Sequence, residues 1–409
     1  MLAYVLWLML PAVQTLGGAI TGGLCILFFG IGVLLDVETL RREWLHLLVR
    51  AACAALLPLF LIRFLSRGGA VSFGFYVQNV MFWFPLVFVG HVRTIGDRTL
   101  WKGLSHTLVA ACMVTLCTTT GWLIEGMLNN ANSYCRALGN ADAVSAEYLA
   151  SLMRRNIGGY GFIYSMVLSI PLVCASIRSC KGKKRMLFCV FLALQIICIV
   201  LSQYTIALIC TAFLLFVEFF AMLLRRLTRK RISYGKALAI SMLFTLPLIV
   251  SVKQLLALVI SISDRFQFHF VTDNLTQVLA ALQGDAVSSG NRLIQYMTAV
   301  DGIRMSPLTG SLFTEHNFIS FHSDILDLIS ATGILGLIGF GFAVWLTARG
   351  SLRGLRSNLH RRQLALCYAA LFAVSLLGTV VYSCEISLVV LLGTLILLQP
   401  HEQPVERQE

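Results

Sequence analysis

Apolar stretches long enough to cross a lipid bilayer recur along almost the whole chain, and this pattern limits the fold more than any other feature. A helix needs about 20 apolar residues to cross the hydrocarbon core. At that depth every backbone hydrogen bond must be made within a helix or a closed barrel. The run LFCVFLALQIICIVL over 187–201 is apolar except for Gln195, whereas a barrel strand alternates in polarity over about 10 residues. The sequence therefore predicts an all-α, polytopic helical membrane protein.

The distribution of charge fits this prediction. The chain is 58% hydrophobic and only 12% charged, whereas roughly a quarter of the residues in a soluble domain are charged. Its net charge of +13 comes largely from three short loops, at 178–185, 225–236 and 349–362, none of which contains an acidic residue. By the positive-inside rule all three loops face the cytoplasm. The basic character is thus explained without a nucleic-acid partner.

Hydropathy predicts eleven or twelve transmembrane helices. The apolar segments fall near 17–35, 44–63, 71–90, 103–124, 160–178, 187–203, 206–223, 236–262, 324–347, 363–382 and 384–399. Residues 1–15 are apolar but short for a crossing, and Pro11 lies within them. The sequence leaves open whether they form a twelfth span.

This topology divides the chain into three parts. Residues 1–262 hold the N-terminal transmembrane helices, with a smaller outer loop at about 125–159. Residues 263–323 form the longest polar segment, which faces outward, and residues 324–409 hold the C-terminal helices and a short cytoplasmic tail. Cys135 and Cys384 both fall on the outer side, and the sequence leaves a disulfide between them open.

The long outer loop is expected to contain two short helices. Asn274 to Gln283 reads as one, ended by Gly284, and Ser289 to Met305 reads as another, stopped by Pro307 and Gly310. In the second helix Arg292, Tyr296, Ala299 and Ile303 recur at helical spacing and share one face.

His322 is the residue that we single out for chemistry. It stands at the outer membrane interface just before an apolar helix. Asp324, which follows it, and Tyr296 are candidate substrate contacts. An imidazole titrates near neutral pH and can accept a proton from a sugar hydroxyl. The alternative is an interfacial histidine that only hydrogen-bonds a helix start, and residue type alone favours that simpler interpretation.

Arg292 is the second candidate, because a guanidinium on a helix at the membrane surface suits a diphosphate. A contact with lipid head groups is the competing interpretation. Outer loops are normally poor in basic residues, so further outer cations favour an anionic ligand. These cations are Arg154, Arg155, Arg265 and Arg304.

Several kinds of site have no sequence support. We find no phosphate-binding loop, no Cys/His pattern with metal-ligand spacing and no hydrolase or metalloprotease motif. No metal or cofactor is expected. Among charged residues near apolar runs, Glu218 is interpreted as snorkelling to the interface. Glu385 lies at the turn between the last two helices, where it can face the outer cavity.

The stretch from Ser289 onward resembles the O-antigen polymerase and O-antigen ligase superfamily of bacterial envelope glycosyltransferases. The matching elements are Asn291-Arg292-Leu293, Ser306-Pro307-Leu308-Thr309-Gly310, His322-Ser323-x-x-Leu326 and Gly333-x-x-Gly336. A second element, Asn156-Ile157-Gly158-Gly159-Tyr160-Gly161-Phe162-Ile163-Tyr164, resembles the entry to a mid-chain helix in Wzy-type polymerases. The motifs that carry the resemblance cover some 60 residues, whereas the resemblance in helix number and loop arrangement covers most of the chain.

The resemblance implies an activity, a substrate and a location. Such proteins act on glycans carried by undecaprenyl diphosphate at the periplasmic face of the bacterial inner membrane, and the lipid diphosphate is the leaving group. By motif position, Arg292 would hold the diphosphate and His322 would act as base or positioning group for the acceptor hydroxyl. Besides this lipid-linked glycan, membrane lipid is the expected partner, and the sequence leaves open whether a chain-length regulator protein binds.

One element of the family pattern is missing. The family often carries a Ser-Arg pair at the outer tip between two mid-chain helices, where this chain has Ser202-Gln203-Tyr204-Thr205. A second diphosphate-binding cation would then have to be Arg265, Arg154 or Arg155.

The expected function is a polymerase of lipid-linked repeat units. The alternatives are an O-antigen ligase that transfers the glycan to lipid A core and, outside the enzymes, a polysaccharide flippase.

Overall fold

The computed structural model describes the chain in several stretches, and everything below refers to them. They are residues 2–16, 18–35, 98–129, 134–139, 145–228, 252–266, 290–313, 322–355 and 357–378, with isolated positions between 268 and 279 and between 380 and 393. These stretches are helical and contain no strand, which confirms the predicted all-α class.

Five helices are long and apolar enough to span a membrane, which confirms the polytopic character. They are α7 (Arg98–Leu128), α10 (Tyr160–Ser179), α11 (Gly182–Ser202), α12 (Thr205–Thr228) and α17 (Asp324–Gly354). α18 (Asn358–Leu377) falls short of this standard, because its first turns carry His360, Arg361 and Arg362. The expected spans at 44–63 and 71–90 lie outside the described residues, as do most of 236–262 and much of 384–399.

The N-terminal residues form two short helices, α1 (Leu2–Met9) and α2 (Pro11–Gln14). They are separated at Leu10, because a proline fits the first turn of a helix but not its interior. At 1.5 Å per residue the pair extends about 20 Å, less than the roughly 30 Å of hydrocarbon. They therefore do not form a full span by themselves. α3 (Gly18–Leu35), at the predicted position, follows them.

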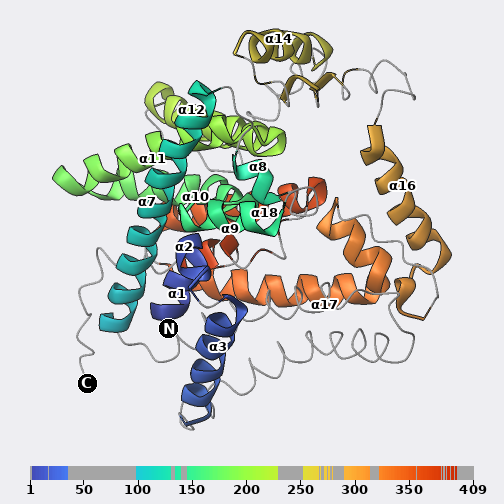
Figure 1. Ribbon diagram of the computed structural model, residues 1–409, viewed down its shortest axis with the longest axis horizontal. Coiled ribbons are helices and arrows are strands. Elements are labelled where there is room, and N and C mark those ends of the chain that lie inside the picture. Colours follow the sequence, from blue (N-terminus) through green and yellow to red (C-terminus); the bar gives the residue numbers. More distant parts are fainter. Residues whose placement is uncertain are drawn as a thin grey trace.

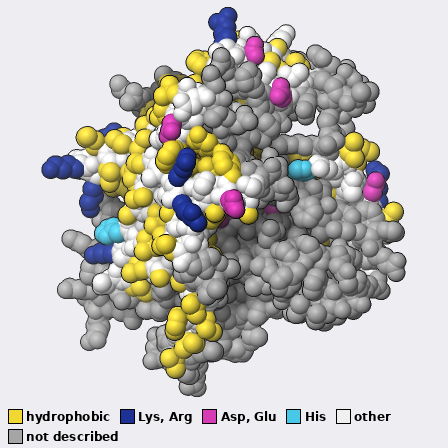
Figure 2. Space-filling model, in the orientation of Figure 1, with side chains coloured by type: hydrophobic (Ala, Val, Ile, Leu, Met, Phe, Trp, Pro, Cys, Tyr) yellow, Lys and Arg dark blue, Asp and Glu magenta, His cyan; other side chains and the backbone are white. Residues whose placement is uncertain are grey.

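Figure 1 shows α10 near the centre of the helices, and its burial agrees. Every residue from Phe162 to Val173 is buried, and α10 packs against α11, α12 and α18. α7 packs against α1 and α11. In Figure 2 hydrophobic side chains cover the visible surface over α3 and α7, as a membrane environment requires.

The smaller outer loop contains two helices that the sequence did not reveal. α8 (Tyr134–Gly139) and α9 (Ala146–Arg154) lie between α7 and α10. Cys135 in α8 is a buried free thiol, and burial raises its pKa well above the usual value. Cys384, its expected disulfide partner, lies outside the described residues.

Glu218 corrects one expectation. Its carboxylate accepts a hydrogen bond from Arg178 at 2.5 Å, which joins α12 to α10, and its side chain is only 7% exposed. The residue therefore does not snorkel, because a basic partner from the neighbouring helix meets it inside the bundle.

Candidate functional site

The second predicted loop helix is present as α16 (Gly290–Met305), within one residue of its expected bounds. It packs against α17, and Ala299 is fully buried. The Tyr296 hydroxyl donates to the Leu377 carbonyl at 3.2 Å, which ties α16 to the end of α18. Arg292 stands one turn before Tyr296 on the α16 backbone, and its side chain is outside the described part. The other predicted loop helix, 274–283, lies almost entirely outside it.

The start of α17 fixes the position of His322. Ser323 caps the helix, since its hydroxyl accepts from the Leu326 amide at 3.3 Å. Asp324 joins α17 to the segment after α18. Its amide donates to the Gly378 carbonyl at 3.2 Å, and its carboxylate accepts from the Val380 amide at 2.5 Å. The half-buried His322 thus precedes a junction that is anchored on two sides.

Asp324 is itself buried, at 3% exposure. One carboxylate oxygen is already used by Val380. The geometry therefore gives Asp324 a part in holding the two helix ends together, which positions His322. The residue was singled out from the sequence as a substrate contact.

Two elements of the family-like motif interlock. α17 is broken at Gly333, whose φ of 70° lies in the left-handed region. Without helical partners, the amides of Ile334 and Leu335 donate to the carbonyl oxygens of Pro307 (2.9 Å) and Leu308 (3.3 Å). The stretch 306–310 is thus inserted into the break, which satisfies backbone groups that a membrane would leave unpaired.

Only glycine fits at this crossing. A Cβ atom on Gly333 would lie 2.1 Å from the Leu308 carbonyl oxygen, and one on Gly310 would lie 2.6 Å from the Gly333 nitrogen. Both glycines have positive φ. The motif glycines therefore serve a close backbone approach that joins the outer loop to α17.

A further group of polar residues meets at the N-terminal end of α10, which the sequence predicts to face outward. The Ser383 hydroxyl donates to the Glu385 carboxylate at 2.7 Å. A Cβ on Gly161 would lie 2.1 Å from that hydroxyl and 2.9 Å from the carboxylate. A Cβ on Gly378 would lie 3.0 Å from the Tyr160 hydroxyl. The segment 378–385 therefore links the start of α17 to the start of α10.

The sequence placed Glu385 at the turn between the last two helices, without naming its partners. It did not identify Tyr160 or Ser383 as site residues. The sequence signal for this contact is Gly161, directly after Tyr160, because a glycine allows another segment to approach the backbone closely. The Tyr160 ring also packs at a tilt against Tyr164 and edge-on against Tyr204, with ring centroids 4.5 Å and 5.3 Å away. Tyr160, His322, Asp324, Ser383 and Glu385 form what we call the outer junction.

The residues of the Asn156 motif connect neighbouring helices through hydrogen bonds. The Asn156 side chain accepts from the Ala12 amide at 3.2 Å and donates to the hydroxyls of Thr115 and Thr118 at 3.1 and 3.2 Å. The Gly158 amide donates to the Thr119 hydroxyl at 2.8 Å. This network connects α2, α7 and the entry to α10, and so holds Tyr160 in place.

The other cations are not gathered around the outer junction. Arg304 lies twelve residues after Arg292, or about 18 Å along the helix, and pairs with Asp301 at 3.4 Å. Arg265 ends α14 (Val252–Arg265), which Figure 1 shows apart from α16 and α17. The Arg155 guanidinium lies over the Trp122 ring at 4.5 Å, and Arg154 is exposed at the end of α9. Arg154 and Arg155 are the nearest of these to Tyr160 along the chain.

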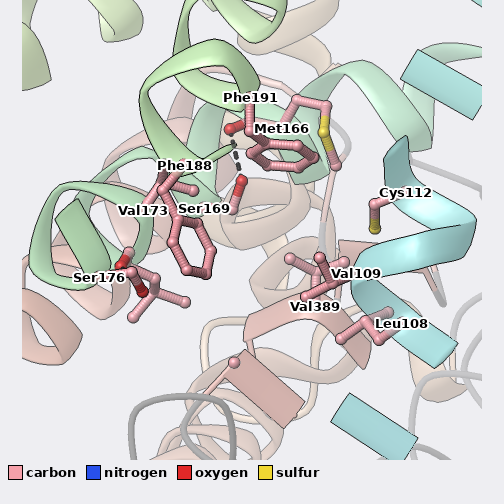
Figure 3. A pocket seen from close by; sticks show the side chains of 12 residues that line it. Leu108, Val109, Cys112, Met166, Ser169, Val173, Ser176, Phe188, Phe191 and Val389 are labelled. Atoms are coloured by element: carbon pink, nitrogen blue, oxygen red, sulfur yellow. Dashed lines mark hydrogen bonds between the residues drawn. The ribbon is translucent and has the colours of Figure 1, made fainter. Parts of the chain in front are cut away.

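The described residues also contain an apolar cavity of about 50 Å³ inside the bundle. Figure 3 shows Leu108, Val173, Phe188 and Val389 among the side chains that line it. It is too small and apolar for a sugar. Within the described part of the chain no three His, Cys, Asp or Glu residues are grouped closely enough to hold a metal ion.

Comparison with known proteins adds no relative. No protein family model matches the chain, and no curated protein matches it either.

Proposed function

We propose that this protein is a Wzy-type polymerase that joins undecaprenyl-diphosphate-linked oligosaccharide repeat units at the periplasmic face of the bacterial inner membrane. The observation that carries the proposal is the meeting of the motif segments. α16, which bears Arg292, packs on α17, which follows His322, and both are hydrogen-bonded to the end of α18. Segments that are far apart in sequence thus border one region of the molecule.

The chemistry divides between the two candidate residues. In the proposed step the bond between the donor sugar's anomeric carbon and the diphosphate oxygen breaks, and a bond to the acceptor hydroxyl oxygen forms. His322 takes the proton of that hydroxyl. Arg292 stabilises the negative charge that develops on the departing lipid diphosphate. The donor carries its own leaving group, so the step is balanced without a nucleotide.

One of the other outer arginines would supply the second cation that contacts the diphosphate. Arg155 and Tyr160 are five positions apart, so a chain of at most about 18 Å joins them. The neighbouring Arg154 is exposed. Arg265 and Arg304 are less suitable, because one ends a helix remote from α16 and the other pairs with Asp301. Arg154 is therefore the preferred second contact.

The arrangement favours an enzyme over a flippase. A conduit needs polar or charged groups facing a path through the middle of several helices. In the described helices the buried acidic residues are Asp324 and Asp327 at the start of α17, and Glu218, which Arg178 neutralises. The other polar residues that are buried in the middle of the described helices, such as Gln195 and Thr211, are uncharged.

Deletion of the gene tests the proposal and separates its alternatives. In a strain that makes long surface glycans, loss of a polymerase should leave single repeat units attached to lipid A core, seen by gel electrophoresis. Polymer that accumulates on undecaprenyl diphosphate instead would identify a ligase. Repeat units that remain on the cytoplasmic side, inaccessible to periplasmic glycosidases, would identify a flippase. Either of the last two results would overturn the proposal.

A further inference from the structure

The end of α17 opposite His322 carries a groove that the proposed reaction does not use. It lies between the last turns of α17 and the start of α18 and has a volume of about 410 Å³. Such a volume falls within the roughly 300–1,000 Å³ of small-molecule sites. The lining residues are Trp345, Ala348, Arg349, Leu352 and Arg361.

The groove carries positive charge that no carboxylate of the described residues neutralises. Between Asp327 and Glu385 the sequence contains no acidic residue, whereas 349–362 contains five arginines. Within the described part of the chain, neither Arg349 nor Arg361 forms an ion pair with a carboxylate. Both side chains are exposed. Two exposed guanidinium groups that line one groove suit an anionic ligand.

An apolar stripe leads from this groove along α17. Ile338, Phe342 and Trp345 recur at helical spacing and are 62%, 44% and 48% exposed. The rings of Phe342 and Trp345 stack with centroids 5.7 Å apart, and the Arg349 guanidinium lies over Trp345 at 4.9 Å. The stripe therefore passes from aliphatic to aromatic to cationic within one helix face.

We infer that this groove binds an anionic glycerophospholipid of the leaflet that the arginine-rich loop faces. The phosphate would lie between Arg349 and Arg361, and an acyl chain would lie on Phe342 and Ile338. Trp345, one turn before Arg349, is of the residue type that is enriched at the membrane–water interface. Basic pockets between transmembrane helices suit such head groups. By the positive-inside rule this leaflet is the cytoplasmic one, so the site is separate from the proposed glycan chemistry.

Quenching of Trp345 fluorescence by brominated lipids tests the inference. The full chain would be placed in phosphatidylcholine nanodiscs that contain dibrominated phosphatidylglycerol or, as the reference, dibrominated phosphatidylcholine. The same measurement on Trp345→Phe isolates the signal of that ring. We expect half-maximal quenching of Trp345 at a roughly thirty-fold lower fraction of the anionic lipid, the product of about five-fold from each of Arg349 and Arg361.

Variants test whether the two arginines cause the preference for the anionic lipid. Arg349→Ala should weaken it about five-fold and Arg349→Ala/Arg361→Ala about thirty-fold, since each basic residue near an anionic surface contributes roughly 1 kcal/mol. Arg361 also donates to the Leu355 carbonyl, so the single variant is the cleaner test of binding. Lys183→Ala/Lys184→Ala, exposed at the start of α11, is the control and should change nothing.

The outcomes separate the sources of the anion. Equal quenching of the wild type by both lipids, or an undiminished preference in the Arg349→Ala variant, would overturn the inference. Inorganic phosphate at millimolar concentration should not relieve the quenching. If it did, the groove would be a site for soluble phosphate and not for a lipid.

Discussion

At the scale of single residues, Asn156 shows what sequence alone could and could not reveal. Its position in a motif marked it as special, and asparagine is one of the few residues that tolerates its φ of 56°. Its partners could not be predicted, because Thr115 and Ala12 are 41 and 144 residues away. The partner of Asp324 could not be predicted either, because Val380 is 56 residues away, just after the end of α18.

Replacement of Asn156 by glycine should destabilise the protein. Glycine keeps the left-handed backbone, so the change isolates the three side-chain hydrogen bonds. At roughly 0.6 kcal/mol for an interhelical hydrogen bond in a membrane protein, we expect a loss of about 2 kcal/mol. The measurement is thermal unfolding of the purified protein in detergent.

A matched control is Gln203→Gly, because Gln203 is the other described non-glycine residue with positive φ. It ends α11, where glycine is favoured. We expect an unchanged or slightly higher unfolding temperature. Equal effects of the two substitutions would refute the role given to the Asn156 side chain.

At the scale of elements, local signals predicted helices well and their irregularities poorly. The C-terminal end of α16 followed from Pro307 and Gly310, and the start of α17 from the polar-to-apolar change at 322–324. The break inside α17 was missed. Gly333 lies in an apolar run that is compatible with a continuous helix, and only the inserted carbonyl groups of 307–308 stabilise the break.

Gly333→Ala should therefore separate the outer loop from α17. A Cβ there meets backbone atoms that cannot move aside cheaply, and the left-handed φ adds about 1 kcal/mol or more. We expect a lower unfolding temperature and loss of long glycan chains in cells. Gly341→Ala lies on the same helix, where nothing approaches within 4 Å. It should behave as wild type, and an equal defect in both variants would contradict the interlock.

At the scale of the whole molecule, composition determined the class of protein but not the grouping of its charges. The hydrophobic runs predicted a helical membrane protein, and five helices meet that description. The four extra outer arginines could not be placed from sequence, since their positions depend on how α9, α14 and α16 pack. The structure leaves them spread over separate helices.

The predicted orientation can be measured with single-cysteine variants in a chain whose twelve native cysteines have been replaced. Lys183→Cys lies in the first basic loop, and Glu147→Cys lies in α9 of the outer loop. A membrane-impermeant thiol reagent should label Glu147→Cys in cells with a permeabilised outer membrane, and Lys183→Cys only after the inner membrane is broken. The reverse pattern would invert the topology.

The most direct test of the central claim is the glycan pattern of the deletion strain complemented with paired variants. His322→Ala and Arg292→Ala should each insert at normal levels yet lower polymer about a hundred-fold or more, because they remove the proposed proton acceptor and the proposed diphosphate contact. His106→Ala, an exposed histidine of α7, and Arg304→Ala, on the same helix as Arg292, are the controls and should restore wild-type chains. Wild-type chain lengths in His322→Ala and Arg292→Ala would contradict the site.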